Sequence, residues 1–248
     1  MAADRSLGPG RLGGAASAPQ AVLLDALGTL VELVDPWASL ARELAARGAP
    51  VDAAHARRAL LAEMTYYRAH HDEAVDARTL AALRDRCAAV LLAALPEPAA
   101  SLTRAQARAA LLAALRFRAF DDAAPTLDGL RAAGVRLVVV SNWDVSLHDV
   151  LRETGLAARV DAVLTSAEER VAKPAPELFA RALRRAGGVS PDRALHIGDS
   201  VAMDVAGARS AGIPAVLIAR DGVAAGVPAG VPVIRSLSEV LPAYTRTF

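Results

Sequence analysis

The sequence predicts an α/β fold: a doubly wound, Rossmann-like parallel sheet into which an all-helical domain is inserted. Two observations lead to this prediction. In the C-terminal half, short apolar runs alternate with segments of helical periodicity, which is typical of parallel strands covered by helices on both faces. Between the first apolar run and the second lie roughly a hundred residues without a convincing strand, too many for one crossover connection.

The core domain is expected over residues 20–33 and 121–248, after a Gly- and Pro-rich stretch, residues 1–19, that predicts a disordered extension. Residues 21–24 form a continuous apolar run that ends at Asp25, as expected for a buried parallel strand. Comparable runs predict further strands, with helices between them. We expect these strands at 135–140, 160–164, 194–197 and 215–219, and two of the helices at 124–133 and 175–186.

The insertion, residues 34–120, is predicted to contain four amphipathic helices. Several of them begin at Asp or Thr, residue types that favour the N-terminus of a helix because their side chains accept hydrogen bonds from free backbone N–H groups. Four such helices can bury their apolar faces against one another in a small bundle. We expect them at 35–47, 52–70, 76–95 and 103–118.

The composition argues against several classes of function. The formal net charge is +1, from 28 basic and 27 acidic residues spread along the chain. This balance gives no excess of positive charge that would indicate binding to nucleic acid or to an anionic membrane. The single cysteine, Cys87, excludes an internal disulfide, and the start of the chain lacks the apolar core of a signal peptide. The longest uncharged apolar run, 87–95, is too short to span a bilayer. We therefore expect a cytoplasmic protein.

Polar residues at the ends of the predicted strands are the candidates for chemistry, because ligands of open parallel sheets bind beyond the carboxyl ends of the strands. Carboxylates, a lysine and a hydroxyl/amide pair that converge there can bind a divalent cation together with a phosphate-sized anion. The lysine stands out, since all the other basic residues of the chain are arginine. The candidates after strands are Asp25 in DALGTL, the pair Ser141–Asn142, and Gly198–Asp199 followed by Asp204; Lys173 in KPAPELF lies before a predicted helix.

This ordered set resembles the four motifs of the haloacid dehalogenase superfamily, and the helical insertion falls where that superfamily places its first type of cap. The resemblance implies that Asp25 is a nucleophile that forms a covalent aspartyl intermediate, which water then hydrolyses. It implies that Ser141 binds a phosphoryl oxygen and that Lys173 neutralises charge on Asp25 and on the bound anion. The implied substrate is a small phosphate ester.

By the same resemblance, the cofactor is Mg²⁺, which prefers hard oxygen ligands and keeps several waters. Asp25 and Asp199 would be direct ligands, the backbone carbonyl of Leu27 would add a third, and Asp204 would act nearby. Contacts to the substrate or to its loop are expected from three further residues, Thr29, Asn142 and Trp143; Trp143 could instead cover the sheet edge.

The sequence departs from the phosphatase pattern at Leu27, where those enzymes carry an aspartate that serves as general acid and base. Positioned acid–base catalysis is typically worth about 10² to 10⁴ in rate. Histidines or acids of the insertion could replace the missing group, and two near the motifs, His148 and His196, are interpreted as packing or capping residues. The candidate donors in the insertion are His55, His70, His71 and Glu63.

Three alternatives to a phosphatase follow from the leucine. Phosphonoacetaldehyde hydrolases need a cap lysine, which this insertion lacks. The 2-haloacid dehalogenases work without a metal, but their fourth motif has Ser and Asn where this chain has Asp199 and Val201. A dehalogenase-like hydrolase therefore remains the second candidate enzyme, and a catalytically weakened protein that binds a ligand with the same fold is the third possibility.

Overall fold

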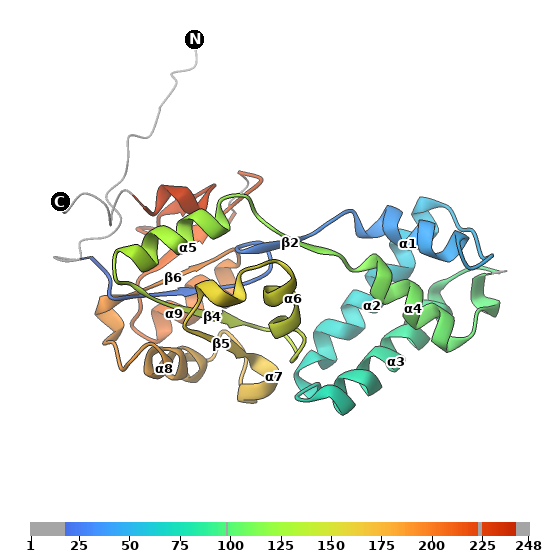
Figure 1. Cartoon of the computed structure of the whole chain (residues 1–248), viewed down its shortest axis with the longest axis horizontal. Helices are drawn as coiled ribbons and strands as arrows, with labels where there is room; N and C mark the ends of the chain where they lie inside the picture. The colour runs from blue at the N-terminus through green and yellow to red at the C-terminus, as the bar shows by residue number, and fades with distance from the viewer. Residues whose placement is uncertain (1–17, 98, 223–224, 242–248) are drawn as a thin grey trace, which may run out of the picture.

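The computed structural model describes residues 18–97, 99–222 and 225–241. The predicted N-terminal extension lies outside the described residues, except for its last two positions. Two lobes lie side by side: an α/β core and a helical lobe that the chain enters after its first strands and leaves before the third (Figure 1). In the part of the chain that is described, no helix has the length and apolar character needed to cross a membrane.

The core contains a six-stranded parallel sheet, which confirms the predicted fold class. Its strand order is β5-β4-β1-β6-β7-β8, so the first strand lies in the middle of the sheet. All residues of β1 are fully buried, because strands that are covered on both faces have no polar side. The strands are β1 (Ala21–Leu24), β4 (Arg136–Ser141), β5 (Ala162–Thr165), β6 (Ala194–Gly198), β7 (Ala215–Ile218) and β8 (Val233–Ile234).

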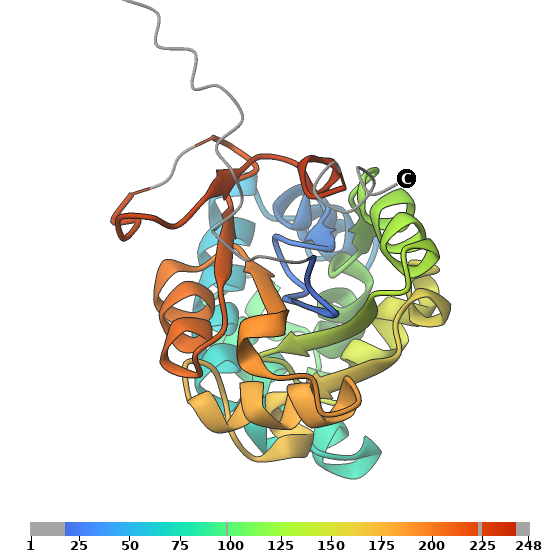
Figure 2. The same cartoon turned by 90° about the vertical axis from the view of Figure 1, so that its left-hand side faces the viewer.

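Helices cover both faces of this sheet (Figure 2). One apolar cluster joins the sheet to α5 (Ala123–Ala132) and α6 (Leu147–Glu153). A second joins the opposite face to α8 (Pro176–Arg185) and α9 (Ala206–Ser210). A short helix, α7 (Ser166–Glu169), follows β5, and a π-helical turn, Val201–Val205, follows β6 directly before α9.

The helical lobe has an apolar core of its own, to which Leu40, Leu60 and Leu83 contribute. As predicted, Asp52, Asp76 and Thr103 accept hydrogen bonds from backbone N–H groups at the start of three of its helices. The helices are α1 (Pro36–Ala45), α2 (Ala53–His70), α3 (Ala77–Ala94) and α4 (Arg104–Ala114). The domain limits expected from the sequence stay a prediction.

A short antiparallel ribbon joins the two lobes, and here the sequence-based expectation was wrong. We expected no strand in this region and a fourth helix as far as residue 118. Instead α4 ends at Ala114, and β3 (Phe117–Ala119) pairs with β2 (Val31–Leu33). Strands of three residues are too short to show an alternating pattern. The pairing fixes where the chain leaves and re-enters the core.

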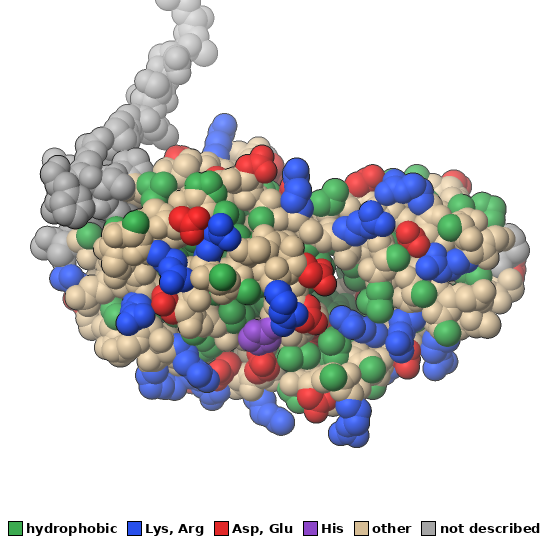
Figure 3. All heavy atoms as spheres, in the orientation of Figure 1, with side chains coloured by type: hydrophobic (Ala, Val, Ile, Leu, Met, Phe, Trp, Pro, Cys, Tyr) green, Lys and Arg blue, Asp and Glu red, His purple; other side chains and the backbone are tan. Residues whose placement is uncertain are grey.

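The helical lobe also contacts the core on the side away from this ribbon. The Tyr67 hydroxyl of α2 donates a hydrogen bond to Asp144, with 2.9 Å between the oxygens. The backbone N–H of Val145 donates to the Ala74 carbonyl at 3.1 Å, and the Ser166 hydroxyl donates to Asp72. Between the lobes the surface is hollowed, and basic and acidic side chains are interspersed on the face that Figure 3 shows.

Candidate active site

Asp25 lies at the carboxyl end of the central strand, where two side chains from other segments meet it. The Ser141 hydroxyl, at the end of neighbouring β4, donates to Asp25 Oδ1 at 3.0 Å. The Lys173 ammonium donates to the same oxygen at 2.6 Å. Both bonds hold the carboxyl group in one orientation, and no side chain among the described residues donates to Oδ2. Within the described chain, Oδ2 is therefore the Asp25 oxygen without a side-chain donor.

Lys173 connects two carboxylates from different segments of the core. Its buried Nζ lies 2.6 Å from Asp25 Oδ1 and 2.6 Å from Asp204 Oδ1. The backbone of the lysine is fixed by Asn142, whose side-chain amide donates to the Lys173 carbonyl at 2.9 Å and accepts from the Lys173 N–H at 2.7 Å. Asn142 was expected to assist the substrate; in the structure its amide holds the lysine loop.

The acidic motif after β6 brings two more carboxylates to this place. Asp199 follows the strand directly, and Asp204 lies in the π-helical turn, where its Oδ2 accepts the Ser200 N–H at 3.0 Å. The Asp204 side chain packs so closely against Gly198 that a Cβ atom on residue 198 would lie 2.2 Å from Asp204 Cγ. A glycine is thus required at the end of β6 for Asp204 to reach the lysine.

Burial and mutual repulsion set the charges of the three carboxylates. Burial, together with the charges of Asp25 and Asp204, raises the pKa of Asp199 to about 7. Burial also raises the pKa of Asp25, against the opposing effect of Lys173. For Asp204, burial is outweighed by Lys173 and His196, which hold its pKa well below the ordinary range. Burial acts to lower the pKa of Lys173, but the two flanking carboxylates raise it.

The three carboxylates are also arranged to hold a metal ion. Asp25, Asp199 and Asp204 each offer an oxygen, and these oxygens lie within 4.8 Å of one another. Gly28 has a positive φ of 79°, and a Cβ atom on it would lie 2.2 Å from an Asp199 oxygen, so the turn after β1 approaches that carboxylate closely. With only one ammonium beside three acids, a divalent cation fits the charge and the oxygen donors of the site.

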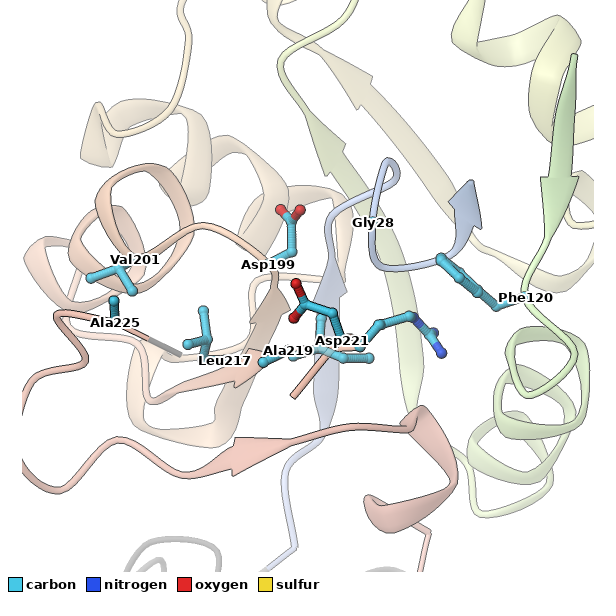
Figure 4. Close-up of a pocket in the computed structure, with 10 residues that line it drawn as sticks. Gly28, Phe120, Asp199, Val201, Leu217, Ala219, Asp221 and Ala225 are labelled. Atoms are coloured by element: carbon cyan, nitrogen blue, oxygen red, sulfur yellow. The ribbon is translucent and has the colours of Figure 1, made fainter. Parts of the chain in front are cut away.

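A pocket of about 570 Å³ borders this site at Gly28 and Asp199. Figure 4 shows Asp199, Asp221 and Phe120 around it. Arg220 also lines the pocket, and its guanidinium group lies 3.6 Å from the centre of the Phe120 ring. The pocket therefore extends from the carboxylate cluster toward the residue that follows the ribbon strand β3.

The remaining residues expected at the site have different surroundings. Leu27 is 42% exposed, in the turn after Asp25. Thr29 is fully buried, and its hydroxyl has no hydrogen-bond partner among the described residues. Trp143 is buried in the core cluster, with its ring 5.2 Å from that of Phe117. Its position thus favours the second interpretation, in which the indole covers the sheet.

The histidines considered as proton donors pair with nearby acids. His55 contacts Asp52 at 2.8 Å, and His70 contacts Glu73 at 2.7 Å. Glu63 is buried inside the helical lobe, where burial raises its pKa and the Cys87 thiol is its hydrogen-bonding neighbour. Within the described parts of the chain, none of these side chains hydrogen-bonds to Asp25, Lys173 or Asp204.

Sequence reasoning missed the contact between His196 and Asp204, which are 2.9 Å apart. Ala194, His196 and Gly198 alternate along β6 and so share one face of the sheet. That spacing places the imidazole on the face where Gly198 admits Asp204. The distance could not be foreseen because it depends on the π-helical turn.

The family follows from comparison with known proteins. A family model described as a haloacid dehalogenase-like hydrolase matches residues 19–212. The chain therefore belongs to the haloacid dehalogenase-like hydrolase family, and the resemblance seen in the four motifs is confirmed.

Individual relatives carry different names. Mouse haloacid dehalogenase-like hydrolase domain-containing protein 3 is 39% identical over 131 residues, 51% of this chain and 52% of that protein. Phosphoserine phosphatase of Thermus thermophilus is 38% identical over 109 residues, 42% of each chain. The chain thus spans about half the length, or less, of these curated relatives. L-2-haloacid dehalogenase of Xanthobacter autotrophicus shares the fold, with a TM-score of 0.66 and 21% identity over 93% of this chain and all of that one.

Proposed function

We propose that this protein is a magnesium-dependent phosphatase that acts on a small phosphate ester through an aspartyl-phosphate intermediate. One observation carries the proposal: a buried lysine bridges Asp25 and Asp204 within a cluster of three carboxylates. A dehalogenase that works without a metal has no need of Asp199, where its fourth motif carries Ser instead. The phosphatase name of the Thermus relative supports the same activity.

In the proposed reaction, the Asp25 carboxylate attacks phosphorus. A new bond forms between a carboxylate oxygen and phosphorus while the bond from phosphorus to the ester oxygen breaks. Ser141 and Lys173 donate hydrogen bonds at Asp25, and we assign to the same donors the stabilisation of a phosphoryl oxygen. Water then attacks the phosphorus of the intermediate, which releases phosphate and regenerates Asp25.

The metal would be held by Asp25 and Asp199, with the Leu27 carbonyl and Asp204 as the other protein groups we assign to it. When bound, Mg²⁺ supplies positive charge that stabilises phosphoryl oxygens in the transition state. Asp204 has a second task that does not depend on the metal, since its Oδ1 holds the Lys173 ammonium in place.

The leaving oxygen requires a proton unless it is stable as an anion, and Leu27 cannot donate one. We therefore propose that the substrates have good leaving groups, as acyl phosphates and aryl phosphates do. Leu27 is 42% exposed two residues after Asp25, so this accessible position offers no proton.

A substrate panel tests the proposal. Phosphate release from acyl, aryl and alkyl phosphates is measured with Mg²⁺ and with EDTA, beside halide release from 2-chloropropionate. We expect hydrolysis of the activated phosphates only with Mg²⁺, and its loss in Asp25→Asn, which keeps the size of the side chain but removes the nucleophile. Halide release in EDTA would establish the dehalogenase instead. Full phosphatase activity in a folded Asp25→Asn variant would exclude Asp25 as the nucleophile.

A further inference from the structure

His196 is a buried polar residue, and its one side-chain hydrogen-bond partner among the described residues, Asp204, belongs to the active site. Its side chain has no exposed surface and projects from β6 toward α8, where the Phe179 ring lies 5.0 Å away in an edge-on arrangement. Its Nε2 lies 2.9 Å from Asp204 Oδ1. A histidine that only filled space on this face could be an apolar residue, as its neighbours in the same cluster are.

The chemistry of the two groups defines which nitrogen carries the proton. A carboxylate can only accept, so Nε2 must be the donor. Nδ1 is buried and has no hydrogen-bond partner among the described residues. The geometry therefore assigns the contact to the Nε2–H and leaves Nδ1 as the ring nitrogen without a partner in the described chain.

The same Asp204 oxygen accepts from two donors. Oδ1 receives both His196 Nε2 and the Lys173 ammonium, while Oδ2 receives the Ser200 N–H. Because His196 and Lys173 converge on one atom, the imidazole determines where that atom lies, and the atom in turn determines where the ammonium lies. Lys173 contacts Asp25 through the same nitrogen, so the chain of contacts reaches the carboxylate at the end of β1.

We propose that His196 is a positioning residue, which holds Asp204 through its Nε2–H so that Asp204 holds the Lys173 ammonium against Asp25. The inference concerns the site of the proposed phosphatase and rests on that function only for its kinetic consequence. His196 touches neither the substrate nor the reacting atoms; it acts through Asp204. Positioning partners of this kind typically contribute about 10- to 100-fold in activity or metal affinity.

Two substitutions separate positioning from packing. His196→Gln keeps a donor nitrogen at the same distance along the side chain, whereas His196→Leu fills a similar volume without a donor. We expect His196→Leu to lower kcat about 10- to 100-fold with little change in KM, and His196→Gln to recover most of the loss. Thermal unfolding of both variants shows whether they remain folded.

The single lysine of the chain provides a readout that needs no activity. In tag-free protein labelled with ¹⁵N-lysine, the one side-chain nitrogen signal belongs to Lys173. We expect this signal to shift and broaden in His196→Leu and to return toward its native position in His196→Gln. If the wild-type protein hydrolyses no phosphate, the proposed function fails, and this signal still decides whether His196 holds the lysine.

An unmoved lysine signal in folded His196→Leu would overturn the proposal. Equal losses of kcat in the glutamine and leucine variants would overturn it as well, since only the shape of the imidazole would then matter. Nitrogen-detected spectra of the histidines supply one more check: a His196 ring protonated on Nδ1 alone contradicts the assignment.

Discussion

Leu27 is the residue at which this chain departs most clearly from the phosphatase pattern. It lies two positions after Asp25 and exposes 42% of its surface, so a side chain at this position can reach a ligand. The turn around it is tightly constrained, since Gly28 has a positive φ and lies against Asp199. Replacing the exposed leucine changes the chemistry of the site without touching that constraint.

We predict that Leu27→Asp raises the turnover of alkyl phosphates selectively. The new carboxyl group can protonate the leaving oxygen, a gain of at most about 10² to 10⁴, or roughly 3 to 5 kcal/mol of activation free energy. Aryl and acyl phosphates should gain little, because their leaving groups depart without a proton. The ratio of kcat/KM values for the two substrate types measures the effect.

Leu27→Asn is the matched control for Leu27→Asp, because asparagine has nearly the size and polarity of aspartic acid but cannot act as a general acid. An equal change for both substrate types in Leu27→Asp would mean that another group already supplies the proton. The histidines and acids of the helical lobe would then be the residues to test.

At the scale of the elements, the sequence predicted the long strands and helices well and the short ones poorly. The expected strands at 21–24 and 194–197 agree with β1 and β6 to within one residue, because central parallel strands are continuous apolar runs. β2, β3 and β8 have two or three residues each, and only pairing with distant residues makes them strands. The local sequence therefore does not predict these strands.

The contact between α2 and the loop after β4 links the helical lobe to the site. Asp144 is buried, and its carboxylate accepts the Tyr67 hydroxyl at 2.9 Å and the Ser146 N–H at 2.6 Å. Three residues earlier, at the end of β4, Ser141 contacts Asp25. The end of β4 and the loop after it therefore carry one residue that contacts the candidate nucleophile and another that contacts the helical lobe.

We predict that Tyr67→Phe weakens this contact, because a hydrogen bond to a charged group contributes about 1.5 to 3 kcal/mol. The Val145 N–H, which donates to Ala74 of the helical lobe, should then exchange faster with deuterium. Tyr66→Phe is the control, since the Tyr66 hydroxyl has no hydrogen bond within the described chain. Equal exchange at Val145 in wild-type protein and Tyr67→Phe would show that the tyrosine does not hold the lobes together.

At the scale of the whole molecule, the motifs indicated which candidate residues would lie together, while the roles of these residues stay a prediction. The motifs gave no indication of the contacts that connect distant segments. Asp25, Ser141 and Asp199, which directly follow or end strands, lie together with Lys173 and Asp204. No sequence motif indicated the ion pair between Asp122 and Arg220. Both are common residue types outside any motif, and they meet only because the ribbon returns the chain beside the end of β7.

That ion pair joins three parts of the core. Arg220 donates to both Asp122 oxygens, at 2.9 and 3.0 Å, and to the Thr29 carbonyl at 2.6 Å. Asp122 also accepts the Ser236 hydroxyl at 2.6 Å and the Leu237 N–H at 2.8 Å. The turn after the nucleophile, the end of the ribbon and the C-terminal segment are thus held by one carboxylate.

We predict that Asp122→Asn lowers the free energy of unfolding by about 1 to 3 kcal/mol at pH 7. Burial acts to raise the pKa of Asp122, but the donors from Arg220, Ser236 and Leu237 outweigh it and hold this pKa below the ordinary value. A carboxyl group whose pKa is lower in the folded state than the unfolded value of about 3.9 stabilises the protein above that pH. The contribution is lost as the pH falls through the folded-state pKa.

The difference between wild-type protein and Asp122→Asn should therefore be constant from pH 7 to about pH 5 and shrink below pH 4. Urea unfolding across this range measures it, with Asp121→Asn as the control, since Asp121 is the exposed neighbour in the same turn. A difference that persists unchanged at pH 3 would mean that the asparagine perturbs packing rather than charge. No difference at pH 7 would mean that the C-terminal segment is held by its apolar contacts with α5, through residues such as Leu237, and that the ion pair only orients Arg220 over Phe120 beside the pocket.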